Sequence, residues 1–159
     1  MSARVGIVMG SSSDRPVMDA AVAALRELGV EAEVKVLSAH RTPDALREWA
    51  AGLEARGVKV VIAGAGGAAH LAGAVAAHTT LPVIGVPLAA PNSVGGGLDA
   101  LLSTAQMPRG IPVATVAVGE AGAANAGILA AQILATADAE LAQRIKTQRK
   151  SMAAKVLSS

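Results

Sequence analysis

Val5-Gly6-Ile7-Val8-Met9 is a continuous apolar run, and the polar stretch Gly10-Ser11-Ser12-Ser13-Asp14 follows it directly. A short, uninterrupted apolar run is typical of a β-strand covered on both faces, as the strands of parallel sheets are. After the polar stretch, apolar residues between Val17 and Leu28 recur at helical spacing, and the glycine that follows is typical of a helix end. This segment therefore predicts a strand, a polar turn and a helix, the first half of a βαβ unit.

The rest of the chain repeats the alternation of strands and helices. Further strands are expected at 31–37, 58–63, 82–87 and 112–118. Helices are expected from Pro43 to just before Gly57 and at 68–79, 98–103 and 123–136, with a charged amphipathic segment at about 138–157. This alternation predicts an α/β fold with a doubly wound parallel sheet. No internal repeat or linker interrupts it, so residues 1–159 are expected to form a single domain.

The composition limits both the core and the chemistry. Hydrophobic residues make up 52% of the chain, yet Phe and Tyr are absent and Trp49 is the one tryptophan. The core must be built from Val, Leu, Ile and Ala, which requires helices and sheet to approach closely. The lack of cysteine excludes disulfides, thiolate metal sites and a cysteine nucleophile.

Charge and hydropathy exclude some partners. The net charge of +2 and the lack of a Lys/Arg run predict no nucleic-acid face. The longest stretch without Lys, Arg, Asp or Glu, residues 60–98, is interrupted by prolines and glycines, so no membrane helix is expected. No secretory signal pattern is visible near Arg4, and a cytoplasmic location is expected.

Three of the expected strand-to-helix turns are polar or glycine-rich: residues 10–14, 38–43 and 64–70. In a parallel sheet these turns share one edge, where the ligands of open α/β sheets bind. Serine hydroxyls and the amides of a helix N-terminus in the first turn suit a phosphate group. Asp14 either accepts hydrogen bonds from ribose hydroxyls or caps its own helix, and both interpretations stay open.

The second turn, Ser38-Ala39-His40-Arg41-Thr42-Pro43, combines a hydroxyl, an imidazole and a guanidinium. Imidazole is the side chain best matched to proton transfer near neutral pH, and a guanidinium is a natural partner for phosphate. Thr42 is expected at the helix N-cap with Pro43 at the first helical position, which turns the helix amides toward the same place. A solvated His40–Arg41 pair in a polar loop is the alternative interpretation.

The third turn, Gly64-Ala65-Gly66-Gly67-Ala68-Ala69, has almost no side chains before His70. It matches the G-x-G-x-x-A pattern of dinucleotide-binding turns, but no acidic residue stands between Glu54 and Asp99 to hold a ribose. A turn this bare lets backbone amides close on a small planar group such as a carboxylate or carbon dioxide. Close strand–helix packing that needs glycine is the alternative interpretation.

The histidines do not predict a metal site. No H-x-x-x-H pair is present, and His70 and His78 stand eight residues apart, off one another's helical face. The sequence also lacks G-x-S-x-G and G-x-x-x-x-G-K-[ST], which excludes the serine-hydrolase elbow and the P-loop.

Taken together, the motifs resemble the PurE family of purine biosynthesis. The matching segments are residues 8–14, 38–43, 62–71, 106–113, 121–126 and 129–136, in family order along almost the whole chain. The resemblance implies a flavodoxin-like three-layer αβα sandwich with a C-terminal helical extension. It also implies a homo-octamer with active sites at subunit contacts, in which residues 138–157 pack on a neighbouring subunit.

The resemblance assigns roles to residues in all three turns. His40 is expected to be the general acid/base, Asp14 to hold ribose hydroxyls, and Ala39 to contribute to the substrate site. The residues expected to hold a 5′-phosphate are Ser11, Ser13, Ser38 and Arg41. Those expected to surround a migrating carboxylate are Gly64, Ala65, Gly66, Gly67 and His70.

The implied reaction moves a carboxylate from the exocyclic nitrogen of a carboxyaminoimidazole ribonucleotide to C4 of the ring, through trapped carbon dioxide. It needs a proton shuttle, a phosphate anchor and a dry pocket, and neither ATP, a metal nor an organic cofactor. The related alternative is carboxylation of aminoimidazole ribonucleotide by free carbon dioxide, and the intact string from Gly64 to Leu71 favours the transfer reaction. A non-catalytic nucleotide-binding module is the third hypothesis, and it would need no histidine at position 40.

One loop departs from the family pattern. Residues 88–98, Leu-Ala-Ala-Pro-Asn-Ser-Val-Gly-Gly-Gly-Leu, are longer and less serine-rich than the family version. The resemblance therefore does not fix the role of this loop, for which a lid near the base is one hypothesis.

Overall fold

A single parallel sheet of five strands organises the computed structural model, which describes residues 4–158. The strand order is β2-β1-β3-β4-β5, and every neighbouring pair is parallel. This is the order of flavodoxin-like doubly wound sheets. The strands are β1 (Val5–Met9), β2 (Ala32–Val36), β3 (Val60–Gly66), β4 (Val83–Leu88) and β5 (Ala114–Thr115).

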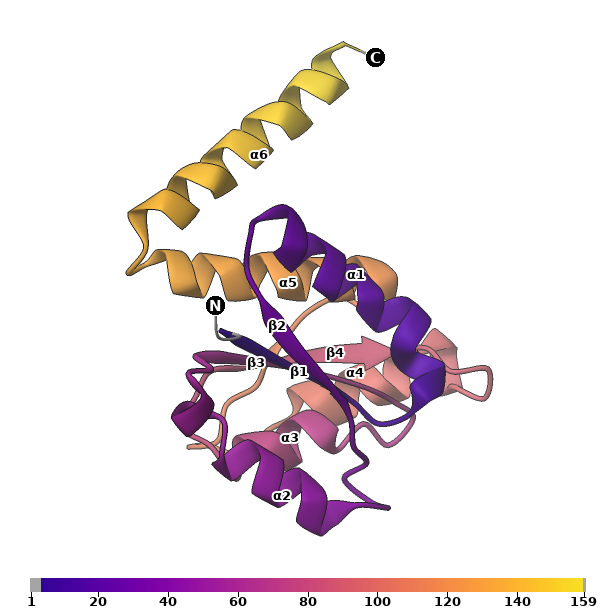
Figure 1. The fold of residues 1–159 in the computed structure, drawn as a ribbon. Helices are drawn as coiled ribbons and strands as arrows, with labels where there is room; N and C mark the ends of the chain where they lie inside the picture. Colours follow the sequence, from indigo (N-terminus) through magenta and orange to yellow (C-terminus); the bar gives the residue numbers. More distant parts are fainter. Residues whose placement is uncertain (1–3, 159) are drawn as a thin grey trace.

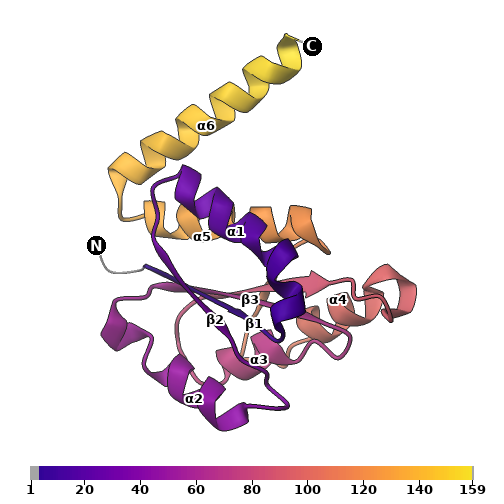
Figure 2. The ribbon, with the colours of Figure 1, turned by 45° about the vertical axis from the view of Figure 1, so that its right-hand side comes forward.

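Helices cover both faces of the sheet. Figures 1 and 2 show α1 (Arg15–Glu27) and α5 (Glu120–Ala135) on one face. The opposite face carries α2 (Pro43–Ala51), α3 (Leu71–Ala76) and α4 (Leu98–Ala105). The last helix, α6 (Ala139–Leu157), starts next to α5 and projects away from the sheet. Three layers and a C-terminal helical extension are thus confirmed. Short 3-10 turns occupy Ser12–Asp14, Glu54–Arg56 and Val94–Gly96.

The core lies on both sides of the sheet, and it is mostly aliphatic and alanine-rich, as the composition predicted. On the α1/α5 side, Ile7, Met18 and many alanines are buried, and Trp49 and Leu53 belong to the cluster on the α2/α3 side. Small residues bring α1 and α5 together: a Cβ added to Gly127 would stand 2.6 Å from the Ala21 carbonyl oxygen. Alanine and glycine therefore let the helices approach closely enough to fill the core without aromatic side chains.

Two predicted strands have bounds that are wrong by two or three residues, and the second and fourth strands are off by one residue at each end. The third begins at Val60 and continues through Gly66, because the segment from Gly64 pairs in register with the end of β4. The glycine-rich turn therefore starts at Gly67. The fifth is only Ala114–Thr115, at the edge of the sheet, where Pro112 has no amide hydrogen to donate.

Two predicted helices are shorter than expected. Gly67 has a φ of +60°, and the chain then turns twice through hydrogen bonds between residues two apart, so α3 begins only at Leu71. It ends at Ala76, which leaves His78 beyond the helix and exposed. The helix from Pro43 ends at Ala51, and a 3-10 turn follows before Gly57, whose φ is +88°.

The single domain expected over residues 1–159 stays a prediction, and residues 1–3 and 159 of that range lie outside the described part of the chain. Among the helices of residues 4–158, none combines the length and the apolar character that a membrane span requires.

Candidate functional site

A cavity of about 410 Å³ lies where the turns after β1, β2, β3 and β4 meet. The chain passes from β1 outward to β2 and returns to β3 on the other side of β1, so this edge of the sheet is a topological switch point. Ligands of open α/β sheets bind at such points. The lining residues are Gly10, Ser11, Asp14, Ser38, Ala39, His40, Arg41, Ala65, Gly66, Gly67, Ala68, Leu71, Ala90 and Asn92.

Three predicted site residues do not line the cavity. The hydroxyl of Ser13 lies behind that of Ser11, to which it donates a hydrogen bond of 2.8 Å. Gly64 is buried within β3, and a Cβ added there would collide with Met18 of α1. Close packing is therefore what Gly64 provides. His70 stands at the edge of the site, next to His40.

The first turn is closed by a capping box. The Ser11 hydroxyl accepts from the Ser13 amide at 3.3 Å, and Oδ2 of Asp14 accepts from the Ser11 amide at 3.0 Å. Burial raises the pKa of the Asp14 carboxyl, although the Ser11 amide and the charge of Arg41 act in the opposite direction. Asp14 occupies the N-cap position of α1 but makes no side-chain capping bond to that helix, because its carboxylate closes the preceding 3-10 turn. The helix-cap interpretation is therefore wrong, and the ribose interpretation stays a prediction for a residue that lines the cavity.

The second turn is held in shape by its own hydroxyls. Thr42 occupies the N-cap position before Pro43, as predicted, but its hydroxyl makes no capping bond to α2. Instead, Oγ1 of Thr42 accepts from the Ser38 amide at 2.8 Å and donates to the Ser38 carbonyl at 3.0 Å. The Arg41 amide donates to the Ser38 hydroxyl at 3.1 Å, and Nη2 of Arg41 donates to the Gly10 carbonyl at 3.2 Å. The guanidinium therefore joins the first two turns.

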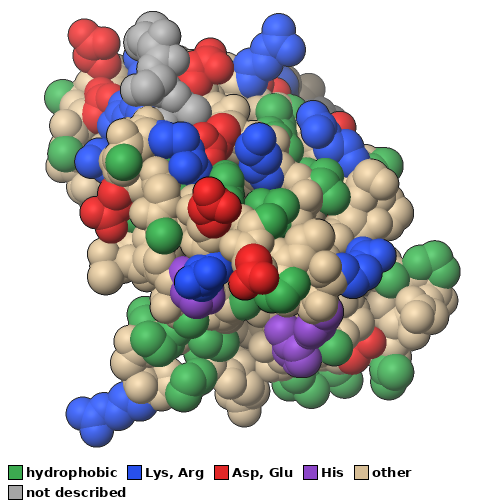
Figure 3. Space-filling view, turned by 60° about the horizontal axis from the view of Figure 1, so that its bottom comes forward, with side chains coloured by type: hydrophobic (Ala, Val, Ile, Leu, Met, Phe, Trp, Pro, Cys, Tyr) green, Lys and Arg blue, Asp and Glu red, His purple; other side chains and the backbone are tan. Residues whose placement is uncertain are grey.

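The two histidines predicted for the site meet across it. Nε2 of His40 lies 2.8 Å from Nδ1 of His70, and the two rings are arranged edge to face with centroids 4.9 Å apart. Both side chains are exposed. Figure 3 shows histidine side chains at the molecular surface beside charged ones on the face that it draws. A hydrogen bond between two imidazoles requires one ring to donate and the other to accept. The pair can therefore hold and pass a proton at the cavity edge.

The part of the cavity lining formed by Gly66 and Gly67 carries no side chains. A Cβ added to Gly66 would lie 3.0 Å from the carbonyl oxygen of Leu88, so β4 approaches too closely for a side chain there. Gly67 has a positive φ, and nothing lies within 4 Å of where its Cβ would be. The wall thus presents peptide groups and open space rather than side chains, a surface that suits a small planar group.

Two of the five lining residues that sequence reasoning missed come from the loop after β4. Ala90 and Asn92 line the cavity, and this loop is the one whose role the resemblance did not fix. A signal was available, because the loop follows the fourth strand at the same sheet edge as the other turns. Gly10, Ala68 and Leu71 also line the cavity, each adjoining a predicted site residue.

A metal centre finds no support in the described residues. Within residues 4–158, no three side chains among the His, Asp and Glu residues come together in a way that could hold a metal ion. The cavity lining itself offers imidazole, guanidinium, hydroxyl, carboxylate and backbone groups.

The fold and the cavity together define a flavodoxin-like α/β protein with a small-molecule site at its switch point. A sequence model of the family described as "AIR carboxylase" matches residues 4–155. This chain belongs to the AIR carboxylase family, in which the PurE proteins fall.

Similar proteins agree on this placement. The N5-carboxyaminoimidazole ribonucleotide mutase of Bacillus subtilis (strain 168) is 54% identical over 159 residues, 100% of this chain and 97% of that protein. The mutase of the same name from Mycobacterium tuberculosis (strain H37Rv) is 58% identical over 142 residues, 89% of this chain and 79% of that protein. The crystal structure of Treponema denticola PurE superposes with a TM-score of 0.85 at 31% identity, covering 97% of this chain and 94% of that one.

Proposed function

We propose that this chain converts N5-carboxyaminoimidazole ribonucleotide into 4-carboxy-5-aminoimidazole ribonucleotide, an intramolecular carboxyl transfer. One observation carries the proposal: the imidazole of His40 lines the same cavity as the bare backbone of Gly66 and Gly67 and as the hydroxyl and guanidinium groups that suit a phosphate. The names of the similar proteins support it, because relatives 54% and 58% identical are called mutases for this nucleotide.

The first two turns would bind the ribose phosphate. Hydroxyls of Ser11 and Ser38 and the guanidinium of Arg41 all line one side of the cavity, with Ser13 directly behind Ser11. A guanidinium has five N–H donors, so the bond from Arg41 to the Gly10 carbonyl leaves others for phosphate oxygens. The carboxylate of Asp14 would accept from ribose hydroxyls, which places the imidazole ring of the substrate near Ala39 and His40.

The chemistry then needs one proton shuttle. The bond between the exocyclic nitrogen and the carboxylate carbon breaks, releasing carbon dioxide, and the nitrogen takes a proton from His40. C4 of the substrate ring, which is nucleophilic because the ring is an enamine, attacks the carbon dioxide and forms the new C–C bond. His40 removes the C4 proton and the ring regains aromaticity, so no net proton is consumed. His70 would keep the His40 ring oriented and supply a second proton-binding nitrogen.

The glycine-lined wall would keep the carbon dioxide from escaping. Ala65, Gly66 and Gly67 would leave space for a linear or planar molecule next to the reacting carbon. Holding the released molecule beside C4 converts a bimolecular encounter into an effectively unimolecular step. The transfer therefore needs no ATP to reactivate the carboxylate.

A carbon-label partition tests this function. Substrate labelled in its carboxylate is mixed with protein in excess unlabelled bicarbonate, and label is followed into the C4-carboxylated product. Retained label is the expected result. Label lost to bicarbonate, with product formed equally well from aminoimidazole ribonucleotide and free carbon dioxide, would assign the carboxylase reaction instead. No product from either substrate would indicate a binding module.

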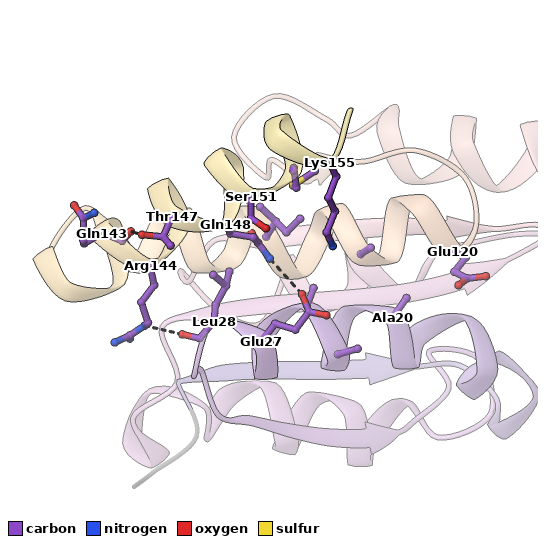
Figure 4. A pocket seen from close by; sticks show the side chains of 15 residues that line it. Ala20, Glu27, Leu28, Glu120, Gln143, Arg144, Thr147, Gln148, Ser151 and Lys155 are labelled. Carbon is purple, nitrogen blue, oxygen red and sulfur yellow. Dashed lines mark hydrogen bonds between the residues drawn. The ribbon is translucent and has the colours of Figure 1, made fainter. Parts of the chain in front are cut away.

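We also propose that the chain forms one domain per subunit and assembles as a homo-octamer in which α6 packs on a neighbour. Within α6, all of which is described, Leu141 and Ile145 are the buried residues, and Met152 and Leu157 are 56% and 88% exposed. A groove of about 910 Å³ lies between α6, α1 and α5, and Gln148 Nε2 donates to Glu27 there at 3.3 Å. Figure 4 shows the side chains that line this groove. A long helix with its apolar residues exposed needs a covering partner.

The substrate, a charged nucleotide that does not cross membranes, supports a cytoplasmic location.

Sedimentation tests the assembly. The full chain is expected to sediment as an octamer, and a chain that ends after Ile145 is expected to keep its α/β circular dichroism but sediment as smaller species. An active full-length monomer would contradict the proposal that subunit contacts complete the site. An octamer formed by the shortened chain would remove α6 from the interface.

A further inference from the structure

The turn from Gly67 to His70 is a weak structure on its own. The Ala69 amide donates to the Gly67 carbonyl at 2.9 Å, and the His70 amide donates to the Ala68 carbonyl at 2.8 Å. Hydrogen bonds between residues two apart are tight γ-type contacts with poor geometry, and Gly67 is in the left-handed region. Such a turn needs a contact from outside to stay in one conformation. It forms part of the cavity wall and ends at His70, whose backbone it positions.

Ser103 of α4 provides that contact. Its hydroxyl oxygen lies 3.0 Å from the Ala69 amide nitrogen and accepts its hydrogen bond, and it donates to the Asp99 carbonyl one helical turn earlier at 2.8 Å. The same oxygen lies 3.4 Å from the Gly67 carbonyl. Ala69 is buried, so its amide has no easy access to water as a substitute partner. Ser103 does not line the cavity and is not among the residues that the sequence motifs single out.

Asp99, one helical turn before Ser103 in α4, holds the loop after β4. Asp99 Oδ2 accepts from the Val94 amide at 3.0 Å, and Oδ1 accepts from the Ala100 amide at 2.8 Å. The carboxylate therefore fixes the loop that contributes Ala90 and Asn92 to the cavity. Through Asp99 and Ser103, the first two turns of α4 connect this loop with the glycine turn that faces His40.

We propose that Ser103 is a positioning residue for the carboxyl transfer: its hydroxyl holds the Gly67–His70 turn so that the backbone wall retains carbon dioxide beside C4. The inference rests on the proposed function, because retention has meaning only for a transfer through released carbon dioxide. Removing the hydroxyl leaves the Ala69 amide with one strained acceptor and frees the wall to shift. The phosphate and ribose contacts lie on the opposite turns and are untouched.

The test compares Ser103→Ala with the wild type in the carbon-label partition. Alanine is the best helix former, so α4 is retained. We expect kcat to fall roughly tenfold, as for the loss of about one buried hydrogen bond, with KM nearly unchanged. The fraction of label retained at C4 should fall as well, and hydrogen–deuterium exchange over residues 67–71 should become faster.

Ser103→Thr keeps the hydroxyl and should restore retention. Thr136→Ala removes a comparable exposed hydroxyl bond, 2.7 Å to the Ile133 carbonyl, and should change nothing.

The outcomes separate the two proposals. Wild-type protein that does not convert the substrate overturns the proposed function and the role of Ser103 with it. An active wild type whose Ser103→Ala variant keeps kcat, label retention and exchange unchanged overturns only the role of Ser103. A Ser103→Ala variant with KM raised in step with the loss of kcat, or a Ser103→Thr variant as leaky as the alanine, would indicate general damage and overturn it too.

Discussion

Two turns of this molecule face each other and differ in almost every chemical respect. The turn from Ser38 to Thr42 is built from side chains, whose hydroxyls close it and whose imidazole and guanidinium point to the cavity. The turn from Gly67 to His70 is built from backbone, and it depends on glycine conformation and a hydroxyl from α4. A site for moving a carboxylate needs both kinds: one to handle protons and phosphate, one to leave space.

The largest expected effect of breaking the side-chain turn comes from His40→Asn. Asparagine keeps polarity and approximate size but cannot take up a proton near neutral pH, so turnover should fall by roughly 10²- to 10⁴-fold. The protein should remain assembled and should still bind the substrate, because the proposed phosphate and ribose contacts come from other residues. Steady-state kinetics and sedimentation check both statements. Turnover within a few-fold of wild type would remove His40 from the mechanism.

Arg41 separates binding from chemistry within the same turn. Arg41→Ala should raise KM roughly 10- to 100-fold through the loss of charge-assisted hydrogen bonds to phosphate, with a smaller change in kcat. Arg41→Lys keeps the charge, but an ammonium cannot bind the Gly10 carbonyl and the phosphate together as a planar guanidinium can. The KM of Arg41→Lys should therefore lie between those of the wild type and Arg41→Ala. Titration with a ribonucleotide monophosphate product analogue measures the affinity directly. Equal affinity in all three proteins would contradict a phosphate role.

A matched pair of glycines tests the backbone turn. Gly67→Ala and Gly29→Ala place a methyl group at similar φ values, +60° and +70°, and should each lose about 1–2 kcal/mol of stability through left-handed strain. Only the first methyl lies at the cavity wall, so Gly67→Ala should also lower kcat by roughly tenfold. Gly29 follows α1, away from the site, and its variant should keep wild-type kcat. Equal activities in the two variants would show that the wall tolerates a side chain.

The two turns also differ in how well sequence reasoning predicts them. The residue types of His40 and Arg41 indicate proton transfer and phosphate binding, and a polar turn after a strand predicts where these residues lie. Glycine carries no such information: Gly64 serves packing against Met18, whereas Gly66 and Gly67 line the cavity, and one motif covers all three. The contacts from Ser103 and Asp99 depend on how α4 packs, which local sequence does not reveal. The alternation of strands and helices was predictable because the hydrophobic periodicity can be read from neighbouring residues. The bounds of the strands were not, because pairing with the neighbouring strand determines where each one begins and ends.

The smallest effect concerns Asp14, where the side-chain turns meet. Burial raises the pKa of its carboxyl in the folded protein, so between its unfolded and folded pKa values the native state binds more protons than the unfolded state. Its contribution to stability is therefore fully present below the unfolded pKa and is lost as pH rises through the folded one. Asp14→Asn removes this titration while keeping an oxygen that can accept from the Ser11 amide. Relative to the wild type, the asparagine variant should gain stability as pH rises from about 3 to about 6, by under about 1 kcal/mol because Asp14 is partly solvated. Urea unfolding of both proteins across that range measures the difference. An asparagine variant whose stability relative to the wild type stays constant or falls as pH rises would show that the Arg41 charge and the Ser11 amide outweigh burial at this carboxylate.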